Sequence, residues 1–243
     1  IKASTDWFFN LCINSNYIRK VDIDKNLKWE FDGKLGKIKI TINLSKPEKD
    51  PEEVKRAKLC NSGYPKCMLC PSNVGWAGNA SKPARQTLRT IPIELNGENW
   101  FMQYSPYVYF DNHAIAFSEE HRPMHIDGNS FKRMVDFVKL FPHYFIGSNA
   151  ALPIVGGSIL AHDHYQGGNK VLPMLKAKAR KYYKLEGYPE VNVSILDWYN
   201  SVVRIESKND KDAVKVADLI LSKWKEYSDE SVDVIAFSEE NGE

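Results

Sequence analysis

Two histidines and a glutamine alternate near the middle of the chain, as His162, His164 and Gln166 in the sequence His-Asp-His-Tyr-Gln. In an extended strand, residues i, i+2 and i+4 point to the same face, so these side chains would project into one site. Glycine pairs at 156–157 and 167–168 flank them. Glycine lets backbone N–H groups approach a phosphate closely. The pattern favours phosphate chemistry, and a strand-end turn with two surface histidines is the alternative.

Imidazole can attack phosphorus at neutral pH because its pKa lies near working pH, so His164 is a candidate nucleophile. The neutral amide of Gln166 can donate to a phosphoryl oxygen without supplying a base that would activate water. Asp163 and Tyr165 occupy the alternate positions. We expect both to face away from the site as packing or solvent residues.

Cys67 and Cys70 form a C-x-x-C pair after Tyr64-Pro65. The two-residue spacer lets both thiolates reach one metal ion, as zinc sites require. One pair supplies only half of the ligands, so redox chemistry and two structural cysteines without metal stay open. Arg85 and Arg89 could pair with a diphosphate, and two solvated strand arginines are the alternative.

Length and composition set outer limits on the fold and function. A chain of 243 residues with 43% hydrophobic residues makes one large domain or two small ones. The net charge of +2 does not favour nucleic-acid binding. No apolar run has the length of a membrane helix, and no secretory signal is visible. Four cysteines do not suggest a disulfide framework, which favours a reduced, cytoplasmic setting.

Hydrophobic periodicity places the expected elements. Alternation predicts a half-buried strand at 37–44, and closely spaced strands at 100–104, 108–110 and 113–117 imply antiparallel pairing. Further strands are expected at 85–93, 145–148, from 175, and within 191–205. Helices are expected at 5–14, from Asp50, at 130–141 with Asp127 or Asn129 as cap, and at 210–224. His113 and His143 have no evident partner, so both are interpreted as non-catalytic.

The segment GSNAALPIVGGSILAHDHYQGG at 147–168 resembles the active-site strand of the histidine-triad superfamily, and within it the galactose-1-phosphate uridylyltransferase branch. That branch has Gln where the hydrolase branches keep a third His. Other stretches agree with the type 2 enzymes of Gram-positive bacteria: ITINLSKPEKDP, YPKCMLC, PARQTLRTIPI and QYSPYVYFDNHAIAF. The resemblance covers nearly the whole chain.

This resemblance implies an α+β fold, a twisted antiparallel sheet of histidine-triad type curled into a half-barrel, with helices on one side. It implies two related halves, the first at 1–170 with the zinc and nucleophile motifs. The second would start within 171–243 and be cut short. Because the chain begins with Ile1 and the related proteins are longer, we expect a fragment, with a homodimer as its possible assembly.

The resemblance also implies the reaction. UMP would move from UDP-glucose to galactose 1-phosphate, giving UDP-galactose, through a uridylyl-histidine formed on His164 with help from Gln166. Asn149, Gly157 and Ser158 would contact the substrate phosphates. A nucleotide hydrolase or phosphorylase of the same superfamily is one alternative, and an inactive zinc-stabilised fragment is another.

A structural zinc ion is implied as well. Its ligands would be Cys67, Cys70, His121 and His162, two sulfurs and two nitrogens in a closed tetrahedral set. Cys60 is the rival fourth ligand, and His125 is a weaker one. Metal on His162 would fix the strand that presents His164.

Overall fold

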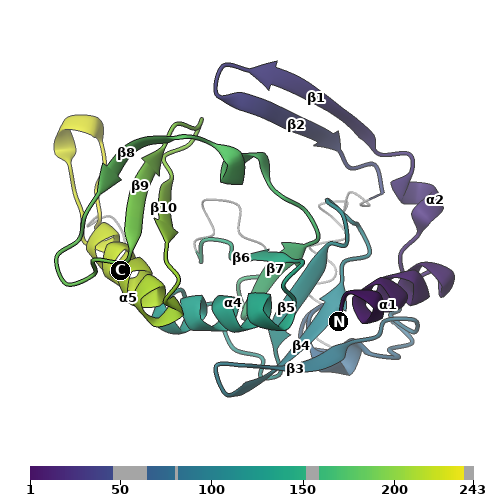
Figure 1. The fold of residues 1–243 in the computed structure, drawn as a ribbon. Coiled ribbons are helices and arrows are strands. Elements are labelled where there is room, and N and C mark those ends of the chain that lie inside the picture. The colour runs from purple at the N-terminus through teal and green to yellow at the C-terminus, as the bar shows by residue number, and fades with distance from the viewer. Residues whose placement is uncertain (46–64, 80–81, 152–158, 238–243) are drawn as a thin grey trace.

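A five-stranded antiparallel sheet forms the centre of the molecule (Figure 1). This computed structural model describes residues 1–45, 65–79, 82–151 and 159–237. The strand order is β3-β4-β5-β7-β6. The strands are β3 (Ile91–Leu95), β4 (Glu98–Tyr104), β5 (Ala114–Ser118), β6 (Phe145–Gly147) and β7 (His164–Gly168). Together with the helices below, the architecture is mixed α+β with antiparallel sheets, as predicted.

Local turn chemistry sets the register of this sheet. Asn96 and Gly97 connect β3 to β4, both with positive φ, and Asn-Gly is the pair that two-residue hairpins prefer. Farther along, β5 pairs with β7 so that Phe117 lies opposite His164 and Ile115 lies opposite Gln166. This pairing places both predicted catalytic side chains on one face of β7.

The other face of the sheet is the hydrophobic core. Side chains that alternate along β4, β5 and β7 are fully buried there, namely Trp100, Met102, Tyr104, Ala114, Ala116 and Tyr165. Helices α1 (Lys2–Asn14) and α4 (Gly128–Leu140) contribute Phe8 and Phe137 to the same cluster. Each large side chain buried in this way contributes about 1.5–3 kcal/mol. Both helices were predicted, and they hold the site-bearing sheet in place.

Helix α4 begins with a capping box. The Asp127 side chain accepts from the backbone N–H groups of Asn129 and Ser130. In turn, the Ser130 hydroxyl oxygen accepts from the backbone N–H of Asp127. The predicted cap is therefore confirmed. On this helix Arg133 is buried, whereas Phe131 is only half-buried. Arg133 turns inward because its guanidinium donates a hydrogen bond to the carboxylate of Glu98 on β4.

A second, three-stranded sheet follows in the order β10-β9-β8. Its strands are β8 (Ala179–Tyr183), β9 (Asn192–Leu196) and β10 (Val203–Glu206), with helix α5 (Asp210–Lys225) beside them. Val191, Val193 and Val216 form its small separate core. The strand expected from residue 175 starts later, because Pro173 opens a 3-10 turn at Pro173–Lys176. The boundary at residue 170 stays a prediction.

Three predictions in the N-terminal half need correction. The strand expected at 85–93 starts only at Ile91, where β3 begins. Strands β1 (Leu27–Gly33) and β2 (Gly36–Ile42) form a hairpin that projects from the body, and almost all its residues are exposed on both faces. The strand predicted at 37–44 is therefore confirmed as β2, but its predicted half-burial is wrong. Residues 108–110 form part of a loop, since Val108 has a φ of 39° that breaks the strand. The helix expected from Asp50 lies outside the described residues. No described helix is both long and apolar enough to cross a bilayer.

Candidate active site and metal centre

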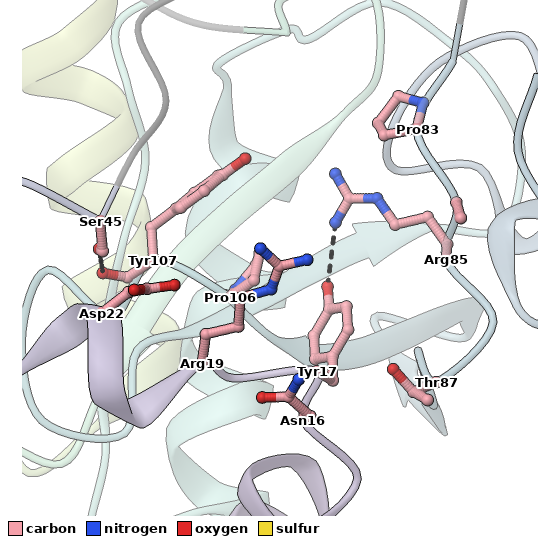
Figure 2. A pocket seen from close by; sticks show the side chains of 11 residues that line it. Asn16, Tyr17, Arg19, Asp22, Ser45, Pro83, Arg85, Thr87, Pro106 and Tyr107 are labelled. Atoms are coloured by element: carbon pink, nitrogen blue, oxygen red, sulfur yellow. Dashed lines mark hydrogen bonds between the residues drawn. The ribbon is translucent and has the colours of Figure 1, made fainter. Parts of the chain in front are cut away.

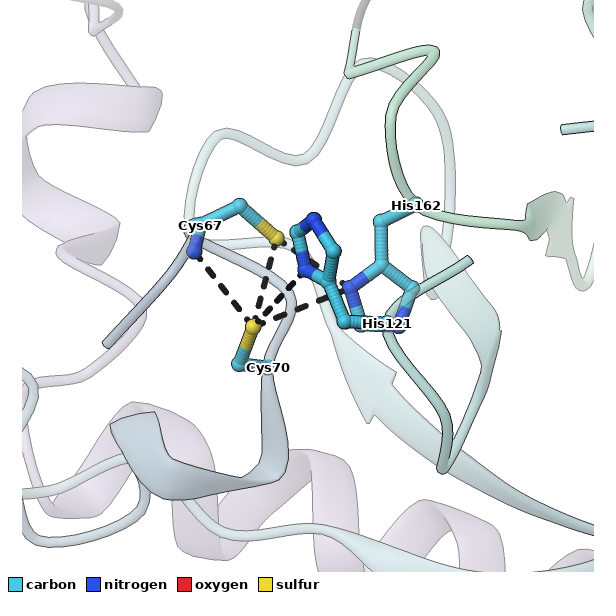
Figure 3. Close-up of side chains that lie close together, drawn as sticks. All are labelled: Cys67, Cys70, His121 and His162. Atoms are coloured by element: carbon cyan, nitrogen blue, oxygen red, sulfur yellow. Dashed lines mark hydrogen bonds between the residues drawn. The ribbon is translucent and has the colours of Figure 1, made fainter. Parts of the chain in front are cut away.

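Four side chains from three separate segments converge beside the start of β7 (Figure 3). The Sγ atoms of Cys67 and Cys70 lie 3.6 Å apart. Nδ1 of His162 lies 3.1 Å from the first sulfur, and Nδ1 of His121 lies 3.2 Å from the second. All four ligand atoms lie within 4.8 Å of one another. The structure thus brings together the four predicted metal ligands.

This donor set fits a tetrahedral ion. Two sulfurs bound to zinc at about 2.3 Å stand about 3.8 Å apart in a tetrahedron, which the spacing of the two sulfurs nearly matches. Nε2 of His162 lies 2.8 Å from the carbonyl oxygen of Ser118, to which it donates. That bond puts the proton on Nε2 and leaves the Nδ1 lone pair facing the sulfurs, as in protein metal sites.

Redox chemistry fits this cysteine pair less well. Burial raises the pKa of the Cys67 thiol to about 11, whereas redox-active C-x-x-C pairs have a lowered pKa. The two sulfurs are not joined in a disulfide. The loop is instead fastened by the buried side chain of Asn73, which donates to the carbonyls of Cys67 and Cys70 at 2.7 and 2.9 Å.

His164 begins β7 and is almost completely buried. Its Nδ1–H donates to the carbonyl oxygen of His162 at 2.8 Å. Burial lowers the pKa of the imidazole, and the hydrogen bond to this carbonyl opposes that shift only in part. The ring is therefore neutral at pH 7. Nε2 carries its lone pair and has no hydrogen-bond partner among the described residues, so it is chemically a nucleophile.

Gln166 lies two residues farther along the same face of β7. Its Oε1 lies 3.0 Å from Nε2 of His113, and its Nε2 donates toward Oδ1 of Asn149 at 3.5 Å. Asn149 follows β6, the neighbouring edge strand. His164, Gln166 and Asn149 therefore line one surface. Gly157 and Ser158, the other predicted phosphate contacts of this segment, lie outside the described residues.

The residues between the histidines fix the backbone. Asp163 is buried and contacts two guanidinium groups, Arg122 at 3.4 Å and Arg133 at 3.7 Å. Burial raises the pKa of Asp163, and the two arginines act in the opposite direction. Tyr165 stacks on Trp100 with ring centroids 5.0 Å apart. Both residues face away from His164 as packing residues, which agrees with the prediction.

The two predicted phosphate arginines have different surroundings. Arg85 lines a cavity of about 280 Å³ and donates from Nη1 to the hydroxyl of Tyr17 at 3.3 Å (Figure 2). Arg19 lines the same cavity, and in the part of the chain that the structure describes neither guanidinium pairs with a carboxylate. Arg89 instead donates to the carbonyls of Gln86 and Leu88 and does not line the cavity.

Comparison with known proteins places this geometry in a family. Residues 1–123 match the family model described as "Galactose-1-phosphate uridyl transferase, N-terminal domain". The chain is 53% identical over 239 residues to a galactose-1-phosphate uridylyltransferase of Fusobacterium nucleatum, covering 98% of this chain and 47% of that protein. The corresponding protein of Caldanaerobacter subterraneus is 52% identical over 243 residues, covering 100% of this chain and 47% of its own length. The chain belongs to the galactose-1-phosphate uridylyltransferase family.

Coverage of these uridylyltransferases is partial. The chain spans about half the length of the two relatives named above. The relative from Butyrivibrio fibrisolvens is 49% identical over 242 residues, which are 99% of this chain and 62% of that protein. No solved structure matches the chain.

The site contains residues that sequence reasoning missed. His113 was interpreted as lacking a partner, yet it contacts Gln166. The sequence spacing could have indicated this contact, because His113 lies two and four residues before Ile115 and Phe117 and so shares their face of the strand. Ile115 and Phe117 lie opposite Gln166 and His164 in the sheet. Arg19 and the buried charges around Asp163 come from distant segments, so no local pattern could identify them. Cys60 lies outside the described residues, and His125 does not belong to the metal cluster.

Proposed function

We propose that this chain carries the nucleotidyl-transfer site of a UDP-glucose–hexose-1-phosphate uridylyltransferase. The observation that supports this most directly is the geometry of His164, whose Nδ1–H is held by a backbone carbonyl while Nε2 stays unprotonated. An imidazole fixed in this way presents one lone pair in one direction, which is what in-line attack on phosphorus requires.

The reaction proceeds in two balanced steps. Nε2 of His164 attacks the α-phosphorus of UDP-glucose, the P–O bond to the β-phosphate breaks, and glucose 1-phosphate leaves with that electron pair. A phosphate oxygen of galactose 1-phosphate then attacks the same phosphorus. The P–N bond breaks, UDP-galactose leaves, and the neutral imidazole is restored.

Charge develops on the non-bridging phosphoryl oxygens during both steps. The side-chain N–H of Gln166 is a neutral donor on the same strand face as His164, so it can stabilise that charge without acting as a base. Asn149 is a further donor and acceptor at hydrogen-bond range of Gln166. Gly157 and Ser158 stay predicted phosphate contacts.

Arg85 is the better supported of the two predicted substrate arginines. With Arg19 it places two positive charges at a cavity that is also lined by the hydroxyl of Tyr17 and by Asp22. Guanidinium groups bind phosphate bidentately, and a carboxylate accepts hydroxyl groups of a sugar. We therefore assign a phosphate-bearing part of the substrate to this cavity and remove Arg89 from the proposed contacts.

Zinc is the metal that we propose for Cys67, Cys70, His121 and His162. When bound, the ion would be structural, because four protein ligands close a tetrahedral site. The residues themselves already connect three segments, and His162 is two positions from the nucleophile. The role of the cluster is thus to position His164.

The finer architecture follows from the same proposal. A histidine-triad type of half-barrel, with a second related half starting after residue 170, agrees with the curved antiparallel sheets.

A homodimer is supported by the projecting β1–β2 hairpin, where Trp29 and Phe31 are 46% and 58% exposed. Light scattering of the purified protein measures this directly, and a monomer would contradict it. The cytoplasm stays the predicted location on the basis of the free cysteines.

Isotope exchange tests the reaction against its alternatives. With UDP-glucose and labelled glucose 1-phosphate, and no galactose 1-phosphate, a uridylyl-histidine intermediate predicts label in UDP-glucose. His164→Ala should abolish the exchange. Net formation of UMP without exchange would favour a hydrolase, and neither reaction in a metal-loaded sample would favour an inactive fragment.

A further inference from the structure

Buried His113 pairs with half-buried Gln166 beside the nucleophile. His113 is only 1% exposed, and its Nε2 lies 3.0 Å from the amide oxygen Oε1 of Gln166. The ring of Phe110 packs against the imidazole with centroids 4.4 Å apart. His113 comes just before β5, next to the strand that carries Gln166. The pair therefore has little freedom to rearrange.

The surroundings of the ring select one tautomer. Nδ1 of His113 is buried and has no hydrogen-bond partner among the described residues. A proton on Nδ1 would leave a buried donor unpaired, which is less well tolerated than an unpaired acceptor. A proton on Nε2 instead makes a bond to Oε1. Burial lowers the pKa of His113 to about 4, so the ring is neutral at pH 7.

This tautomer determines which end of the amide faces the substrate surface. Because Oε1 is held by His113, the NH₂ group must point the other way, and it does so toward Oδ1 of Asn149. A reversed amide would present a carbonyl oxygen to the negatively charged phosphoryl group. It would also place NH₂ against an N–H donor.

We propose that His113 is a positioning residue that locks the amide of Gln166 with its NH₂ group toward the transferred phosphoryl group. This inference rests on the proposed function, because Gln166 has no phosphoryl group to stabilise without it. His113 itself touches no reacting atom. Its effect passes through the orientation of one side chain.

Two variants form a matched pair for the test. His113→Gln places an amide N–H near the position of the imidazole Nε2, whereas His113→Asn places one near Nδ1 and leaves Oε1 of Gln166 without its donor. Both introduce a buried amide, so their effects on folding should be similar. The measurement is the rate constant for uridylylation of His164 by UDP-glucose, followed by intact mass.

We expect His113→Asn to lower this rate constant by roughly 10- to 100-fold, less than the roughly 100- to 1,000-fold loss when such a donor is removed outright, with little change in the UDP-glucose concentration that gives half-maximal rate. His113→Gln should restore most of the rate. In a Gln166→Ala background, the Asn variant should have no further effect, because the residue it acts through is gone. Equal rates for the two His113 variants, or additive losses with Gln166→Ala, would overturn the proposal.

A second readout does not depend on activity. Nitrogen-15 NMR of the imidazole should report a proton on Nε2 of His113, and Gln166→Ala should perturb that signal. A proton on Nδ1 would overturn the inference even in an active protein. If the wild-type protein forms no adduct but His113 has the Nε2–H tautomer and senses Gln166, the proposed reaction fails while the orientation of the amide stands.

Discussion

The Nδ1–H of His164 donates to the carbonyl oxygen of His162 at 2.8 Å, so the candidate nucleophile is held by the backbone of a candidate metal ligand. The side chain of the same His162 enters the cluster with Cys67. One residue thus connects the metal centre to the orientation of the imidazole. A change in the cluster should therefore alter the orientation of the His164 imidazole through this hydrogen bond, without any contact between metal and substrate.

Loss of the metal site should therefore reduce both stability and activity. We expect Cys70→Ser to lower the bound zinc per chain and to lower the melting temperature. Zinc at about 100 times its Kd stabilises by about 2.7 kcal/mol, which corresponds to about 5–10 °C for a chain of this size. Elemental analysis measures the bound zinc per chain, and calorimetry measures the melting temperature. Cys12→Ser, a buried cysteine outside the cluster, is the control for zinc content. Full zinc content in Cys70→Ser would contradict the proposed ligand set.

The buried charges around Asp163 give a second prediction. Arg133 contacts both Asp163 and Glu98, and removing it leaves a buried carboxylate with less compensation. We expect Arg133→Met to cost about 3–5 kcal/mol of unfolding free energy, as for other broken buried pairs. Urea denaturation measures this. Lys139→Met breaks the exposed pair with Asp210 and should leave the free energy of unfolding nearly unchanged, because solvent screens the pair. Similar losses in both variants would contradict the account.

Glu98 should make a defined contribution to the pH dependence of stability. Burial raises its pKa, but hydrogen bonds from Arg133 and Arg122 outweigh burial and leave the pKa below its ordinary value. A lowered folded-state pKa gives stability that is present above about pH 4.3, the unfolded value, and lost as pH falls through the folded value. The melting-temperature difference between wild type and Glu98→Gln should therefore be largest near pH 6–7 and shrink below about pH 4. A constant difference would exclude this role.

Arg85 and Arg89 offer a matched comparison for substrate binding. Arg85 faces the cavity with Arg19, whereas Arg89 is occupied by backbone carbonyls. Because one charge-assisted contact to phosphate would be lost, we expect Arg85→Gln to weaken binding of galactose 1-phosphate by roughly tenfold. Arg89→Gln should leave it nearly unchanged. Titration calorimetry measures both affinities, and a loss confined to Arg89→Gln would reverse the assignment.

The sequence predicted those parts of the fold and site that depend on local patterns. Alternating residues located β4, β5 and β9, and Asp127 located the start of α4, because strand periodicity and capping are encoded by neighbours. The spacing of Cys67 and Cys70 indicated a metal pair for the same reason. The resemblance to a known family added His121 and His162 to that pair.

What could not be predicted depends on tertiary contacts. The strand at 37–44 has the alternation of a half-buried strand, yet almost all residues of the hairpin are exposed, and its contact with Tyr199 is made at the turn around Leu35 and Gly36. His113 becomes significant only when β5 and β7 pair, and Arg19 only when the segment that follows α1 and the loop before β3 meet at the cavity. Such contacts join residues far apart in the chain, so the hydrophobic periodicity of a local segment cannot predict them.

The central claim is that His164 becomes covalently uridylylated, and intact mass spectrometry tests it most directly. We would incubate the zinc-loaded protein with UDP-glucose and compare it with His164→Ala, using His125→Ala as a control for an exposed histidine outside the site. The account predicts a gain of one UMP in the wild type and in His125→Ala, reversed by galactose 1-phosphate, and no gain in His164→Ala. An adduct that persists in His164→Ala, or no adduct in a folded, zinc-loaded wild type, would contradict it.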